Sequence, residues 1–350
     1  MNYIMMVLGW ILQFFYRLVG NYGVSIILFT IFIKLLLLPL DLKQKKSMAK
    51  TQKLQPLLNA VQQKYANDKE KLSQETMKLY QKYGINPMGG CLPMLIQLPI
   101  IFSLFYVIKQ PLMYMMGVDF GETWRVANAY NEWLASLGGA GEVFESLPES
   151  IRTAVVASSD GKLNTFGINE IKIARVISEH PEILKSAHLT PELAGKLSNI
   201  NFDFLGMDLS QTPDYKKIFA MFGGVMPTLG DALLWLIPVF SGASAWFSAH
   251  ISRPQQPKEE KHKVLAENEK PKENASADTM KSMTMMMPFM SVFFAFTLPA
   301  GVGLYWIVSN LIQIAQHFLV NKFFNVDVSL EEMEGDMQNV KSRKKRKNSR

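Results

Sequence analysis

Long apolar runs alternate with polar stretches along the chain, and the runs are long enough to cross a lipid bilayer. A membrane-spanning helix needs about 20 mostly apolar residues. Five runs approach that length, at 24–40, 91–108, 231–249, 283–298 and 302–320. Only three residues separate the last two runs, and they include Pro299 and Gly301, so we expect a tight helical hairpin there. The pattern predicts an all-α membrane protein with a bundle of five transmembrane helices.

Residues 1–20 are also apolar, but their pattern differs from that of the five runs. Gln13 and Arg17 lie four residues apart and therefore share one face of a helix. We interpret 1–20 as an N-terminal helix that lies in the membrane interface. The alternative is a sixth span that forms a hairpin with the first. A secretory signal peptide fits poorly, because the segment has neither a basic start nor a small-residue cleavage site.

The polar stretches divide the remaining chain into regions. Region 21–110 holds the first two spans, and between them two apolar stripes at helical spacing predict a cytoplasmic helical hairpin at 42–83. Its turn is expected near Asn67, and Pro56 is expected to kink or restart the first helix. Region 229–320 holds the last three spans and a Pro-, Glu- and Lys-rich linker at 251–282, a composition typical of flexible segments.

The segment 111–228 is longer than a connection between two spans requires. It contains several stretches with helical patterns, which predict a small helical subdomain: 143–157, 168–186 and 191–199. The last region, 321–350, ends in the basic sequence KSRKKRKNSR. That block is interpreted either as a contact with anionic lipid or as a contact with nucleic-acid phosphate, that of ribosomal RNA.

Lysine and arginine in short connections set the orientation, because they accumulate on the cytoplasmic side. Residues 41–90 carry ten lysines against four acidic residues, and the tail is basic. With five spans, both regions fall on the same side. We therefore expect a multi-pass protein of the cell membrane with its N-terminus and 111–228 outside and its C-terminus in the cytoplasm.

Composition agrees with a membrane protein and gives little support to an enzyme. The 350 residues are 48% hydrophobic, and the single Cys91 excludes an intramolecular disulfide framework. Asp231, at the end of a span, is the only acidic residue in the five runs. The sequence SGASA at 241–245 has Ala where a nucleophile elbow needs its serine. We predict no catalytic residues, no metal ligands and no cofactor.

The spans do contain scattered polar side chains. Lys34 lies in the middle of an apolar run, where a charge costs about 2.5–3.5 kcal/mol, and Thr30 lies one turn before it. The others are Gln97, Ser309, Asn310 and Gln313. Gathered on one side of a bundle, they would line a hydrated, cationic cavity. The structural alternatives are that Thr30 bonds its own backbone, that Gln97 and Asn310 join helices, and that Lys34 reaches the cytoplasmic surface.

Four stretches strongly resemble the YidC/Oxa family of membrane protein insertases. They are GNYGVSIILFTIFIKLLLLPL (20–40), LQPLLNAVQQKY (54–65), NPMGGCLPMLIQLPIIFSLFY (86–106) and LPAGVGLYWIVSNLIQIAQ (298–316). The resemblance covers the spans and the hairpin but not residues of about 120–200, which read as an insertion. It implies a five-span core around a hydrophilic groove that opens to the cytoplasm and to lipid.

The resemblance also implies roles for single residues. Lys34 stands where the family usually has an arginine, so the positive charge is kept and the guanidinium fork is lost. Thr30 falls on the groove threonine. Tyr305 and Trp306 fall on an aromatic pair that touches passing substrate.

The function implied is insertion and folding of membrane proteins, alone or beside the Sec translocon. The partners implied are nascent membrane proteins, membrane lipids and, through the basic tail, the ribosome, with a monomer sufficient. A small channel or transporter using the same cavity is the main alternative. An intramembrane enzyme is a third reading, and it has no supporting residues.

Overall fold

The computed structural model describes most of the chain, and the described part is mainly helical. The described residues are 2–85, 92–137, 170–186, 191–197, 200–222, 224, 226–251, 286 and 288–323. They belong to two compact units. The first is Met1–Ile33, Pro99–Ala245 and Pro288–Asn310, and the second is Lys34–Leu98, Trp246–Met287 and Leu311–Arg350.

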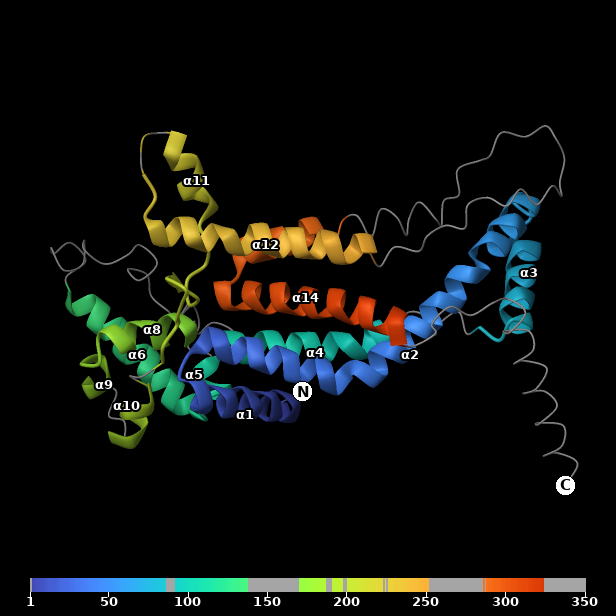
Figure 1. Ribbon diagram of the computed structural model, residues 1–350. Helices are drawn as coiled ribbons and strands as arrows, with labels where there is room; N and C mark the ends of the chain where they lie inside the picture. The colour runs from blue at the N-terminus through green and yellow to red at the C-terminus, as the bar shows by residue number, and fades with distance from the viewer. Residues whose placement is uncertain are drawn as a thin grey trace, which may run out of the picture. The chain divides into compact units, whose positions relative to one another are not determined.

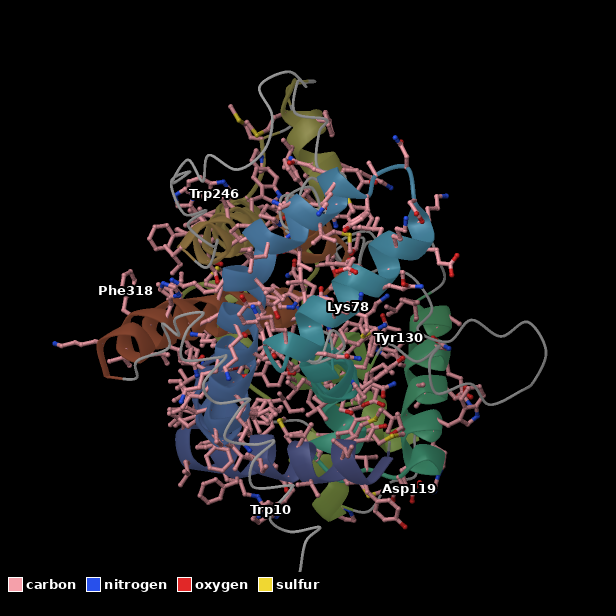
Figure 2. All side chains as sticks on the ribbon, turned by 90° about the vertical axis from the view of Figure 1, so that its right-hand side faces the viewer. Trp10, Lys78, Asp119, Tyr130, Trp246 and Phe318 are labelled. Carbon is pink, nitrogen blue, oxygen red and sulfur yellow. The ribbon has the colours of Figure 1, made fainter. Side chains whose placement is uncertain are left out.

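The first unit begins with helix α1 (Asn2–Val19), which ends at Gly20. Gly20 has a φ of 65°, in the left-handed region that favours glycine, and its N–H donates to the Tyr16 carbonyl over 2.8 Å. Helix α1 packs closely on α5 (Pro111–Tyr114), since a Cβ at Gly9 would collide with the Tyr114 carbonyl. Trp10 is 66% exposed on α1 (Figure 2). The interfacial placement of 1–20 stays a prediction.

The region after α5 is a small, mainly helical layer. Helix α6 (Phe120–Ser136) begins with a capping box, in which Asp119 accepts from the Glu122 N–H and Glu122 accepts from the Asp119 N–H (Figure 2). It is followed by α8 (Glu170–Glu179), α9 (Ile183–Ser186) and α10 (Pro191–Leu197). Helices are thus found within 168–186 and 191–199 as expected, whereas 143–157 lies outside the described residues.

A short extended segment joins this layer to two long helices. Strands β1 (Asp203–Phe204) and β2 (Met207–Asp208) pair antiparallel within it. The Asn201 carbonyl accepts from the Tyr22 N–H over 2.9 Å, at the start of α2 (Tyr22–Lys64). The Leu209 and Gln211 carbonyls accept from the N–H groups of Gly301 and Ala300, at the start of α14 (Ala300–Phe323). Backbone donors that a helix leaves unpaired at its N-terminus are therefore satisfied by the segment 201–211.

Three further helices belong wholly or partly to the first unit. They are α11 (Tyr215–Phe222), the first part of α12 (Leu229–Ile251) and the helix Pro288–Thr297. Within this unit α12 lies beside α14 (Figure 1), and a Cβ at Gly303 of α14 would collide with the Ile237 side chain of α12. Among the described helices, α2 and α12 are long and apolar enough to cross a membrane, while Tyr3–Val19 and Pro288–Thr297 are shorter apolar helices. The five-span count stays a prediction.

The second unit contains the polar end of α2 and the helix α3 (Lys69–Lys82). The Asp68 side chain caps α3 by accepting from the Lys71 N–H, so the turn falls where it was expected. Buried Leu54 and Leu58 of α2 pack with Tyr83 and Ile85, which follow α3. Of the two outcomes expected at Pro56, the restart is wrong, because α2 is continuous through Pro39 and Pro56. The kink stays a prediction. The helix α4 (Leu92–Lys109) spans the boundary of the two units.

Candidate functional site

Thr30 and Lys34 lie one turn apart on α2, which places them on the same helical face. Thr30 is fully buried, and its hydroxyl donates to the Ile26 carbonyl over 2.6 Å. The structural alternative for Thr30, a bond to its own backbone, is thus present. Because the hydroxyl acts as the donor in this bond, both lone pairs of its oxygen can still accept from a further donor. Lys34 is partly buried on α2.

Three charged groups follow the same face of α2. Asp41 is seven residues after Lys34, and Lys45 is four residues after Asp41, spacings that return to one side of a helix. Burial raises the pKa of Asp41, and the Lys34 and Lys45 ammonium groups oppose that rise. Burial lowers the pKa of Lys45, while Asp41 opposes that shift and Lys34 adds to it. The α2 face therefore carries one more positive than negative charge.

Two of the predicted polar residues join α14 to α12. In the first unit, the Asn310 side-chain amide donates to the Ser244 hydroxyl over 3.1 Å. In the second unit, the Ser248 hydroxyl donates to the Gln313 carbonyl oxygen over 3.2 Å. Asn310 and Gln313 thus act as interhelical contacts in this structure, one of the alternatives that the sequence leaves open for Asn310.

The two members of the aromatic pair, Tyr305 and Trp306, have different surroundings. Tyr305 is only 7% exposed, and its hydroxyl hydrogen-bonds with Ser309 one turn later. The Trp306 ring is partly buried and lies 5.8 Å from the Phe294 ring of the helix Pro288–Thr297. Gln97 belongs to α4, and its side chain is outside the described set.

The sequence analysis missed a row of serines on α12. Ser241, Ser244 and Ser248 are all buried. Ser241 shares a hydrogen bond of 2.7 Å with Ser291 of the helix Pro288–Thr297, and the other two contact α14. The spacing of three and four residues places them on one face, and this signal was available in the sequence. The row therefore joins α12 to the helix Pro288–Thr297 and to α14 through hydrogen bonds between otherwise apolar helices.

The apolar helices and the polar contacts between them define an integral membrane protein of the all-helical class. The family model described as 60Kd inner membrane protein matches residues 14–159 and 175–327, most of the chain. The chain belongs to this family, the YidC/Oxa family that the sequence motifs resemble.

Several curated relatives carry the name Membrane protein insertase YidC. The Fusobacterium nucleatum protein is 58% identical over 93 residues, which are 27% of this chain and 45% of that protein. The Caldanaerobacter subterraneus protein is 51% identical over 106 residues, or 30% of this chain and 52% of that protein. The Nitratidesulfovibrio vulgaris protein is 55% identical over 95 residues, 27% of this chain and 18% of that protein. The matched stretches thus span about half or less of these relatives.

Proposed function

We propose that this protein inserts membrane proteins into the cell membrane and assists their folding, without catalysing a covalent reaction. The observation that carries this proposal is the family match over most of the chain. The names of the similar proteins support it. The matched stretches cover only part of these relatives, so the activity of the whole chain is a proposal that the experiment below tests.

The proposed site is a hydrophilic groove within a five-span bundle. It is formed by side chains of three predicted spans: Lys34, Thr30, Gln97, Tyr305, Trp306, Asn310 and Gln313. A substrate with one apolar span must carry a polar tail across the membrane. A hydrated groove shortens the apolar barrier to that tail, and the charge of Lys34 attracts its acidic residues. The apolar span then moves along the groove wall, past Tyr305 and Trp306, into lipid.

Hydrophobic partitioning and the membrane potential supply the driving force in this proposal. The membrane potential contributes about 2.3 kcal/mol per elementary charge for each 100 mV. A small channel or transporter remains the alternative reading. It differs because a small solute would cross without any peptide.

The proposed orientation places the N-terminus and 111–228 outside and the tail inside. In this orientation the lysine-rich part of α2 and the basic tail face the ribosome and the anionic inner leaflet. Removal of 341–350 should weaken co-sedimentation with ribosomes in a salt-dependent manner. Unchanged sedimentation would assign the tail to lipid. Insertion alone and insertion beside the Sec translocon are both compatible with this arrangement.

The central test is reconstitution of the purified chain into liposomes with a short single-span substrate. Protease protection of the substrate's translocated tail should exceed that in empty liposomes. Release of an entrapped small solute should match that of empty liposomes. Equal tail protection with and without the protein would overturn the insertase proposal, and peptide-independent solute release would favour the channel.

A further inference from the structure

Two buried hydrogen-bond donors in the second unit lack an acceptor among the described residues. They are the Lys45 ammonium nitrogen on α2 and the Gln316 side-chain amide nitrogen on α14. Gln316 is 7% exposed. A buried donor without a partner destabilises the folded state, and more so when it is charged. Such groups are rare in folded proteins, and each one points to an acceptor supplied from elsewhere.

Both donors belong to the second unit. His317, the residue after Gln316, lies within electrostatic range of Lys45. Asp41, one turn before Lys45, is also within range of it, yet it is not within hydrogen-bond distance of the ammonium. Lys34 adds a second positive charge to this face. The cluster thus has an excess of positive charge and two unused donors, which suits an oxyanion.

The surroundings indicate that the oxyanion belongs to a lipid. Phe318 (Figure 2) and Leu319, which follow His317 on α14, are 58% and 54% exposed. Leu36, on the apolar part of α2, is 62% exposed. Large exposed apolar side chains beside polar ones are expected where a helix meets acyl chains and headgroups. Lys45 lies five residues beyond the apolar run 24–40 of α2, and Gln316 lies two turns before the end of α14.

We propose that Lys45 and Gln316 bind the phosphate of an anionic phospholipid at the membrane face where α2 leaves the bilayer. The phosphate oxygens accept from the Lys45 ammonium and the Gln316 amide, and the acyl chains extend toward the bilayer centre, against the exposed Leu311 and Leu36. The proposal depends on the placement of the helices in a membrane and not on insertase activity. Its failure would leave the proposed function untouched.

The test measures retention of phosphatidylglycerol by the full chain in phosphatidylcholine nanodiscs, with native mass spectrometry or a labelled lipid. Lys45→Met and Gln316→Leu should each weaken binding about tenfold, since each removes one phosphate contact. Lys45→Arg should keep binding. Lys43→Met is the matched control, because Lys43 is exposed on the same helix and should have no effect.

Competition distinguishes the lipid from other anions. Inorganic phosphate at millimolar concentration should fail to displace the labelled lipid, because it lacks the acyl contacts. Displacement by inorganic phosphate, or by an acidic peptide in preference to phosphatidylglycerol, would overturn the lipid assignment. Equal effects of Lys45→Met and Lys43→Met would also overturn it, provided that thermal unfolding shows all variants to be folded.

Discussion

Asn310 of α14 donates a hydrogen bond to the hydroxyl of Ser244 on α12 over 3.1 Å, and both groups lie between apolar helices. Such contacts between membrane helices contribute about 0.6 kcal/mol on average, with a maximum near 1.7 kcal/mol. The pair therefore predicts a measurable coupling between two positions that are 66 residues apart in the sequence.

The first prediction is a double-mutant cycle on this pair. Ser244→Ala and Asn310→Leu should each lower the stability of the chain in detergent, and the double variant should lose about 0.6–1.7 kcal/mol less than the sum. Equilibrium unfolding measures the four stabilities. Ser244→Ala combined with Ser178→Ala, an exposed position on α8, should be additive. Additivity in the Asn310 cycle would show that the hydrogen bond contributes nothing.

The second prediction concerns the close approach of α14 to α12 at Gly303. Gly303→Ala should destabilise the protein by about 1–3 kcal/mol, because the new methyl group would overlap the Ile237 side chain. Ile237→Ala should relieve part of that loss by making room. Gly230→Ala on α12 is the control, since its Cβ would meet only Thr228 at an ordinary 3.7 Å. A drop in thermal stability for Gly230→Ala equal to that for Gly303→Ala would contradict the steric explanation.

The third prediction is a pH dependence caused by Glu170, which is 1% exposed and accepts from the Met113 N–H over 3.0 Å. Burial raises the pKa of Glu170 to about 8, although the N–H groups of Met113 and Leu112 oppose the rise. The folded state therefore holds the proton more tightly than the unfolded state. The contribution of Glu170 to the free energy of unfolding is fully present below about pH 4.5. It then falls by about 1.4 kcal/mol per pH unit up to about pH 8.

Glu170→Gln tests this dependence directly. The glutamine oxygen can still accept from Met113 without a charge, so the variant should lose the decline in stability between about pH 5 and 8. Chemical denaturation at a series of pH values measures the slope. Glu132→Gln, at an exposed site on α6, is the control and should keep the decline. A Glu170→Gln profile identical to that of the unmodified chain would refute the assignment.

The fourth prediction distinguishes two hypotheses for Lys34. Either its charge acts in the groove, or its side chain extends to the cytoplasmic surface. Lys34→Arg should keep most insertion activity, because charge and depth are preserved. Lys34→Ala should lose activity mainly on substrates with acidic tails, and Lys34→Glu should be the most impaired. The measurement is insertion of two substrates that differ only in tail charge, at matched expression. Equal insertion of both by the unmodified chain and by Lys34→Ala would falsify the groove-charge proposal.

Local signals in the sequence predicted much of the secondary structure. The polar break after Lys64 and the capping Asp68 located the turn between α2 and α3. The restart expected at Pro56 is wrong, because a proline side chain can be accommodated in a long helix that neighbouring contacts hold, here through Leu54 and Leu58. The kink expected there stays a prediction. The serine row of α12 could have been predicted from its spacing of three and four residues.

Contacts between segments that are far apart in the chain could not be predicted from the sequence. The Lys45 and Gln316 donors are separated by 271 positions, and nothing in either stretch indicates that both are buried. The burial of Glu170 likewise depends on α5, which lies 57 residues earlier. Such features arise from packing between elements, which periodicity along one element does not report.

The segment 201–211 has a consequence for the order in which the chain is assembled. Its Asn201 carbonyl meets the start of α2, while its Leu209 and Gln211 carbonyls meet the start of α14. A ribosome makes α2 first, this segment next and α14 last. When Ala300 emerges, its acceptor is already present on the part of the chain that α2 anchors. The last long helix can therefore dock on a segment that is already in place. A cleavage between 201 and 211 before folding should impair assembly of the protein more than the same cleavage made after folding.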